Sequence, residues 1–182
     1  GSTAAEVALK LALQYWSNRG QPSRKTFIAL HHAYHGDTVG AMSASEDSVF
    51  TRPFAPMLFD VVRAHAPYCY RCPVGLERTS CHIECLWTAG PSGTGPAKAG
   101  PNASRSSARP SDTGTLESLL VEHGDTVAAV LVEPMLQGAG GMIVWPSEFL
   151  AGVRALCDRF GTLLVADEVL TGFGRTGRMF AC

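Results

Sequence analysis

Apolar residues follow two spacings along this chain, and each spacing predicts a different kind of element. Near the N-terminus they recur at intervals of three and four, which is typical of a helix. This set consists of Ala4, Ala8, Leu11, Ala12 and Tyr15. Leu9, Leu13 and Trp16 make the other side apolar too, so we expect a helix buried between two layers. A capping box of Thr3 and Glu6 is expected to begin it, and Gly20 to end it.

Short, continuous apolar runs alternate with helical segments and predict buried strands. The runs are 26–30, 58–66, 127–133 and 162–167. Helices are expected at 37–45, at 116–123 and within 146–160, with Pro146 near the first turn of the last one and Gly161 ending it. The sequence therefore predicts an α/β fold with a mainly parallel sheet flanked by helices.

Residues 88–112 break this pattern because they are almost entirely Gly, Pro, Ala, Ser and Thr. Such a composition offers too few large apolar groups to offset the entropy of ordering. We predict a flexible, low-complexity insertion between 1–87 and 113–182. Asn102 and Ser104 match a glycosylation acceptor, but without a secretory signal we interpret the match as chance.

The composition narrows the function classes. A chain of 182 residues is expected to form one domain. Of its residues 46% are hydrophobic, and the formal net charge is −1, so nothing in the composition indicates binding to nucleic acid or to an anionic membrane. No apolar run approaches the roughly 20 residues that span a bilayer, and we expect a cytoplasmic location. The chain begins at a helix start and stops abruptly, so we expect N-terminal and C-terminal parts of a longer parent to be missing.

Gly172, Gly174 and Gly177 have the spacing G-x-G-x-x-G directly after the run 162–167. A dinucleotide fingerprint needs a helix after the glycines and an acidic residue about 20 positions later. Here the acidic residue, Asp167, comes before the glycines. An NAD-binding dehydrogenase is therefore kept only as an alternative.

Asp167 is better interpreted as a working carboxylate. It follows a predicted buried strand, at the edge of the sheet where α/β proteins bind ligands. A carboxylate there is costly unless it is paired, and a protonated pyridine nitrogen of pyridoxal 5'-phosphate would be a suitable partner. The structural alternative is that Asp167 pins the following loop.

Two more segments fit the same cofactor. Gly1 and Ser2 offer free N–H groups and a hydroxyl at a helix start, which suits a phosphate. Tyr34 and His35, beside Gly36, offer an aromatic platform for the ring. Taken singly, Ser2 would be only a cap, Tyr34 only core and His35 only a hydrogen-bonded loop residue.

Together these segments resemble one known family. The stretches GSTAAEVALKLALQYW, YHGDTVGAMS, VLVEPMLQGAGGM and LLVADEVLTGFGRTGRMFAC are similar to class III, fold-type I pyridoxal-phosphate aminotransferases, over nearly the whole chain except 88–112. The resemblance implies that 1–87 and 113–182 are the first and second parts of the cofactor-binding large domain. It also implies a homodimer for the full-length parent.

The motifs resemble most the members that transfer the amino group of S-adenosylmethionine to 8-amino-7-oxononanoate, giving 7,8-diaminononanoate in biotin biosynthesis. Other members, with ω-amino acid or diamine donors, stay open. So does a non-catalytic folding or dimerisation fragment.

The resemblance also assigns roles to single residues. Gly1 and Ser2 would hold the phosphate, His35 would lie at the cofactor, and Asp167 would pair with the pyridine nitrogen. Val169 would pack on the ring face opposite Tyr34, provided that the strand continues to it.

For the substrate, the resemblance points to Tyr34, which would line the pocket, and to Asp37 and Arg175, the latter through its planar guanidinium. Two features depart from the family pattern. Leu170 stands where many members have glutamine, which disfavours their amino acid donors. The Schiff-base lysine of the family would come roughly thirty residues after Asp167, beyond Cys182, so the chain alone is not expected to turn over.

Four thiols, Cys69, Cys72, Cys81 and Cys85, fall within a Cys-rich segment, 69–85, interpreted as an insertion. Four thiolates suit a structural zinc ion, but the spacing of the second pair does not match common zinc ribbons. We favour reduced thiols and no metal, with zinc as the alternative.

Overall fold

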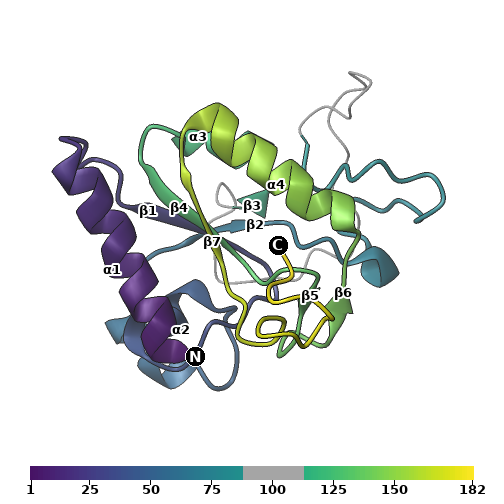
Figure 1. Cartoon of the computed structure of the whole chain (residues 1–182), viewed down its shortest axis with the longest axis horizontal. Helices are drawn as coiled ribbons and strands as arrows, with labels where there is room; N and C mark the ends of the chain where they lie inside the picture. Colours follow the sequence, from purple (N-terminus) through teal and green to yellow (C-terminus); the bar gives the residue numbers. More distant parts are fainter. Residues whose placement is uncertain (88–112) are drawn as a thin grey trace.

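The structure, a computed structural model, describes residues 1–87 and 113–182. Within them, five parallel strands form a sheet in the order β3-β2-β1-β4-β7 (Figure 1). The strands are β1 (Thr26–Leu30), β2 (Val62–Ala64), β3 (Thr113–Gly114), β4 (Val127–Val132) and β7 (Leu163–Ala166). A separate antiparallel pair joins β5 (Leu136–Gln137) and β6 (Ile143–Val144). The predicted insertion 88–112, with Asn102, lies outside the described residues.

Helices cover both faces of the sheet (Figure 1). One layer contains α1 (Ser2–Asn18) and α2 (Val39–Ala44), and the other contains α3 (Leu116–His123) and α4 (Ser147–Phe160). Two short 3-10 helices, η1 (Arg52–Met57) and η2 (Cys69–Arg71), lie in the connections. The mainly parallel α/β fold predicted from the sequence is confirmed.

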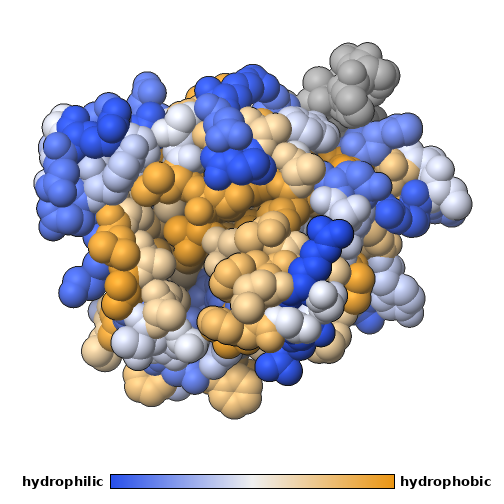
Figure 2. All heavy atoms as spheres, in the orientation of Figure 1, coloured by the Kyte–Doolittle hydropathy of each residue, from blue (hydrophilic) through white to orange (hydrophobic). Residues whose placement is uncertain are grey.

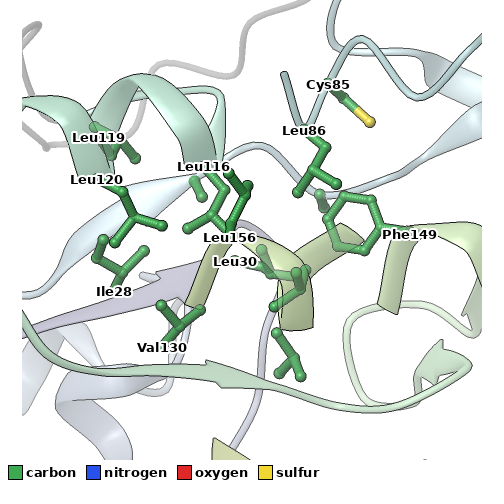
Figure 3. Packing of buried hydrophobic residues seen from close by; sticks show 14 of the residues in the cluster. Ile28, Leu30, Cys85, Leu86, Leu116, Leu119, Leu120, Val130, Phe149 and Leu156 are labelled. Carbon is green, nitrogen blue, oxygen red and sulfur yellow. The ribbon is translucent and has the colours of Figure 1, made fainter. Parts of the chain in front are cut away.

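The side chains of β1 alternate between two hydrophobic cores. Phe27 packs with Leu9 and Trp16 of α1, whereas Ile28 and Leu30 belong to the core under α3 and α4 (Figure 3). Burial on both faces explains why the strands are continuously apolar in the sequence. Residues of β1 and β4 belong to both cores, so these two strands are held from both faces of the sheet. The loops that follow them therefore start from well-packed positions.

The outer edge of the sheet differs from expectation. The run 162–167 was expected to be a buried strand, but all four residues of β7 are only half-buried. Figure 2 shows apolar surface over this strand, between α1 and α4. The reason is that β7 pairs with β4 on one side only within the described residues.

The start of α1 also corrects two expectations. The N-cap is Gly1, and no side chain caps the helix, so the capping box of Thr3 and Glu6 is wrong. Glu6 Oε1 instead accepts a hydrogen bond from the backbone N of Gly40 at 2.6 Å, because the start of α2 offers unpaired N–H groups there. The helix buries one face only: Leu11, on the other, is 62% exposed.

None of the helices in the described residues is long and apolar enough to cross a membrane.

Candidate active site

The candidate site is formed by the loops that follow β1, β4 and β7. These strands are neighbours in the sheet and run parallel, so the segments that follow them meet at one edge. Tyr34 and His35 come from the first loop, Glu133 begins the second, and Asp167 begins the third.

Asp167 is paired with His35, not with solvent. Nδ1 of His35 lies 2.8 Å from Oδ2 of Asp167, and the backbone N of Val169 donates to Oδ1 at 3.1 Å. The side chains of His35 and Asp167 are 1% and 14% exposed. Burial alone would raise the pKa of Asp167, but the hydrogen bonds from His35 and Val169 outweigh it and hold the pKa below its usual value.

The surroundings of His35 also fix its protonation. A carboxylate only accepts, so Nδ1 carries the proton and donates it to Asp167. Nε2 is buried and has no hydrogen-bond partner among the described residues. A proton on Nε2 would be a buried donor without an acceptor among the described residues, which is costly.

The loop after β1 is folded tightly against the start of α1. The backbone N of Asp37 donates to Oγ of Ser2 at 3.2 Å, and a Cβ on Gly36 would overlap Ser2. Gly36 also has a φ of 128°, which disfavours any side chain. The structure thereby brings Ser2 and Asp37, 35 residues apart, into contact, and the interpretation of Ser2 as a mere helix cap is wrong.

The N-terminus of α1 suits an anion. The first turn of a helix leaves its N–H groups without intrahelical acceptors, and the helix dipole favours negative charge there. Around Gly1 the structure is open, with nothing within 4 Å of the place where a Cβ would lie. A phosphate group therefore fits beside Gly1 and Ser2.

Tyr34 is not a core residue. The residue is 42% exposed, and its Oη donates to Oδ2 of Asp37 at 2.9 Å. This hydrogen bond raises the pKa of Tyr34. Both side chains line a cavity of about 1160 Å³. Apolar residues from α2 and the segment after it contribute to the lining, namely Met42, Phe50, Phe54 and Met57, beside acidic residues such as Glu46 and Asp47.

Two predicted site residues, Val169 and Arg175, do not line this cavity. Val169 is 62% exposed, and the expectation that the strand continues to it is wrong, because β7 ends at Ala166. Arg175 is exposed in a turn and does not line the cavity that Tyr34 and Asp37 line.

The glycine motif does not bind a dinucleotide in the expected way. Gly174 and Gly177 have φ values of 84° and 91° and lie in consecutive turns, and no helix follows them in residues 168–182. Without that helix the dinucleotide alternative is wrong. The glycines instead let the backbone turn.

Glu133 was missed by the sequence analysis. Only 7% exposed, it accepts hydrogen bonds from the backbone N of Tyr34 at 3.1 Å and of Gly138 at 3.0 Å. Burial raises its pKa despite these bonds. The rule that singled out Asp167, a carboxylate directly after an apolar strand, would have found Glu133 too.

The four clustered cysteines are free thiols. Cys85 lies in the core beside Leu86 (Figure 3), and burial, followed by the charges of the neighbouring thiols, raises its pKa strongly. No three His, Cys, Asp or Glu side chains of 1–87 and 113–182 are grouped so that they would hold a metal ion.

The parallel sheet, with Tyr34, Glu133 and Asp167 on the loops at its carboxyl-terminal edge, defines the chain as an α/β domain of the class that binds ligands at that edge. The comparison with known families is more specific: residues 1–182 match the family described as "Aminotransferase class-III". The chain belongs to this family, as the resemblance in the sequence predicted.

Individual relatives agree with the family. The chain is 45% identical to an adenosylmethionine-8-amino-7-oxononanoate aminotransferase of Geobacter sulfurreducens and 44% identical to the one of Nitratidesulfovibrio vulgaris. Both matches cover all of this chain but only 34% and 29% of the relatives. The chain thus spans about a third of the length of these curated relatives.

Solved structures lead to the same family. The crystal structure of the adenosylmethionine-8-amino-7-oxononanoate aminotransferase of Methanocaldococcus jannaschii matches with a TM-score of 0.71 and 32% identity, over 100% of this chain and 32% of that one. An amine transaminase from an uncultivated Pseudomonas species, in its PLP-bound form, matches with a TM-score of 0.78 and 33% identity, over 100% and 35% of the two chains.

Proposed function

We propose that the complete protein is a pyridoxal-phosphate-dependent aminotransferase that transfers the amino group of S-adenosylmethionine to 8-amino-7-oxononanoate, giving 7,8-diaminononanoate for biotin. The observation that carries the proposal is Asp167, whose carboxylate His35 keeps ionised at the ligand-binding edge of the sheet. The names and identities of the relatives support the substrate pair.

When bound, the cofactor supplies an electron sink for the amino acid carbon. Asp167 is proposed to keep the pyridine nitrogen protonated, because a carboxylate within hydrogen-bond reach raises the pKa of its partner by about 1–3 units. Gly1 and Ser2 would hold the phosphate. Tyr34 and Val169 would cover the two ring faces, and the exposure of both side chains leaves them accessible for this.

Substrate binding is proposed for the cavity beside Tyr34. Asp37, which lines it, would attract the cationic amino groups that both substrates carry, while the apolar part of the lining suits the carbon chain of 8-amino-7-oxononanoate. Arg175 is proposed to contact a substrate carboxylate through its planar guanidinium. Since the chemistry proceeds in two half-reactions, one pocket must accept both substrates in turn.

We further propose that 1–87 and 113–182 are two parts of one cofactor-binding large domain, and that the complete protein works as a homodimer. A cytoplasmic location belongs to the same proposal, because thiols such as the six in this chain persist in a reducing compartment.

The test uses the complete protein, loaded with pyridoxal 5'-phosphate or stripped of it. With S-adenosylmethionine and 8-amino-7-oxononanoate, the loaded protein is expected to form 7,8-diaminononanoate, followed by mass spectrometry, and the stripped protein is not. Loaded protein that forms no product from this pair would overturn the substrate assignment.

One observation favours a second donor class. The amine transaminase has the higher TM-score of the two structures described above, 0.78 against 0.71, at a similar identity. A loaded protein that is inactive with S-adenosylmethionine but converts a ω-amino acid or a diamine would establish this second class.

A further inference from the structure

Glu133 occupies the centre of the candidate site, between the loops that carry the predicted cofactor and substrate residues. It follows β4, which lies between β1 and β7 in the sheet. Its two carboxylate oxygens are used separately: Oε1 accepts from Tyr34 N, and Oε2 accepts from Gly138 N. One buried side chain thus ties the loop after β1 to the loop after β4.

The third loop is reached through Gly138. A Cβ on Gly138 would overlap Cδ2 of Leu170, so the side chain of Leu170 packs directly on this backbone. Leu170 is three positions after Asp167 on the loop that follows β7. Fixing the backbone of Gly138 therefore also fixes the surface against which the Asp167 loop rests.

A carboxylate is needed for this role. Both backbone N–H groups donate to it, and hydrogen bonds to an ionised acceptor are stronger than those between neutral groups. An amide in its place would present a donor to one of the two N–H groups. Burial raises the pKa of Glu133 even with both bonds made, so the loss of either bond would make the buried carboxylate still less favourable.

We propose that Glu133 is a positioning residue, which holds Tyr34, Gly138 and, through Leu170, the Asp167 loop at the spacing that pyridoxal 5'-phosphate and the substrates require. The inference rests on the proposed function, since it concerns the same site. It adds a residue that touches neither the reacting atoms nor the cofactor but sets the distance between the groups that do.

The test compares Glu133→Gln with Glu46→Gln in the complete protein. Glu46 is a matched control, because it too is a partly buried carboxylate that holds the loop after β1, through His31 Nδ1 at 3.0 Å and His32 N at 2.7 Å. Two quantities are measured: amide hydrogen exchange of cofactor-free protein, in peptides that contain Tyr34 or Gly138, and the dissociation constant of pyridoxal 5'-phosphate.

For Glu133→Gln, we expect exchange at Gly138 to become about tenfold faster or more, and the cofactor dissociation constant to rise by a similar factor, because a charge-assisted hydrogen bond is lost. Glu46→Gln is expected to leave exchange at Gly138 and the cofactor dissociation constant within about twofold of the wild type, because its hydrogen bonds are confined to His31 and His32 among the described residues. Unchanged exchange and affinity in a folded Glu133→Gln protein, or equal effects of the two substitutions, would overturn the proposal.

Glu133→Asp provides a second variant if Glu133→Gln does not fold. It keeps the charge but is one methylene shorter, so it is expected to protect only one of the two peptides; protection of both as in the wild type contradicts the inference. The exchange experiment needs no cofactor. A wild-type protein that does not bind pyridoxal 5'-phosphate therefore defeats the proposed function, whereas normal exchange in the variants defeats the inference about Glu133.

Discussion

At the scale of single residues, Glu133 and Asp167 have pKa values that are shifted in opposite directions although both follow strands of one sheet edge. Burial dominates at Glu133 and raises its pKa, whereas hydrogen bonds from His35 and Val169 dominate at Asp167 and lower its pKa. Asp167 is thus the carboxylate that stays reliably ionised, as a partner of a cationic ring must.

The pairing with His35 leads to a prediction for Asp167→Asn. With its carbonyl oxygen held by Val169 N, the asparagine NH₂ would face Nδ1 of His35. Two donors would then oppose each other, so the ring proton is expected to move to Nε2 despite the lack of a partner there among the described residues. ¹⁵N chemical shifts of the ring in cofactor-free protein report the tautomer directly. We also expect kcat of the loaded protein to fall about a hundredfold, since the pyridine nitrogen loses about 1–3 pKa units of support.

Asp158→Asn is the control, because the side chain of Asp158 is exposed on α4 and, within 1–87 and 113–182, pairs with Arg154 alone, at 2.6 Å. It is expected to leave kcat unchanged. ¹⁵N shifts that place the proton of the wild-type His35 ring on Nε2 would contradict the assigned tautomer.

Much of this site could be predicted from sequence, but its contacts could not. Asp167 was found from its position after an apolar run, and Gly1, Ser2 and Tyr34 from local composition and family likeness. The partner of Asp167 is 132 residues away, and only the parallel order of β1, β4 and β7 brings His35 to it. The role of Glu6 at α2 was missed for the same reason, since a local rule suggested a capping box.

At the scale of elements, apolar runs located the central strands and α3 well, because burial on both faces leaves a clear pattern. The predicted bounds 26–30 and 116–123 coincide with β1 and α3. The strand observed within the run 58–66 is shorter than predicted: β2 comprises only Val62–Ala64, the residues that pair with β1. The short pair β5 and β6 was not predicted, since two-residue strands leave almost no periodicity.

Arg63 caps the C-terminal end of α2, a contact that the sequence did not reveal. This guanidinium, buried in β2, donates to the backbone oxygens of Ser43, Ala44 and Ser45 and so closes the end of α2. Burial lowers the pKa of Arg63 without removing its charge. Ser45 Oγ in turn accepts from His35 N, which connects this cap to the candidate site.

Arg63→Lys is predicted to lower the free energy of unfolding by about 2 kcal/mol or more, because a lysine ammonium cannot reproduce the planar arrangement of three hydrogen bonds. Urea unfolding of the cofactor-free complete protein measures the change. Arg154→Lys, at an exposed helix pair, is the control and is expected to change it by less than about 0.5 kcal/mol. Equal effects of the two substitutions would show that the hydrogen bonds of Arg63 at the end of α2 add no more to the free energy of unfolding than an exposed ion pair does.

At the scale of the whole molecule, two buried ionisable groups make the free energy of unfolding depend on pH, each in its own pH range. Although burial opposes it, hydrogen bonds from His31 and His32 lower the pKa of Glu46 to about 2. Its contribution is therefore present above its ordinary pKa and is lost as the pH falls toward 2. A second contribution, from a histidine, is also lost as the pH falls, but in a range above that of Glu46.

This histidine is His65, and burial, followed by the charge of His31, lowers its pKa to about 4 from an ordinary value of 6.5. Between these values the unfolded chain binds a proton that the folded state does not, so stability is full above pH 6.5 and is lost as the pH falls to 4, by up to roughly 3 kcal/mol. His65→Gln, which does not titrate, is predicted to flatten this part of the curve while leaving the loss below pH 4 in place. Urea midpoints of both proteins at pH 7, 5.5 and 4, with an NMR titration of the His65 ring, measure the effect; parallel curves, or a ring that titrates near 6.5, would mean that His65 is not held neutral by the fold.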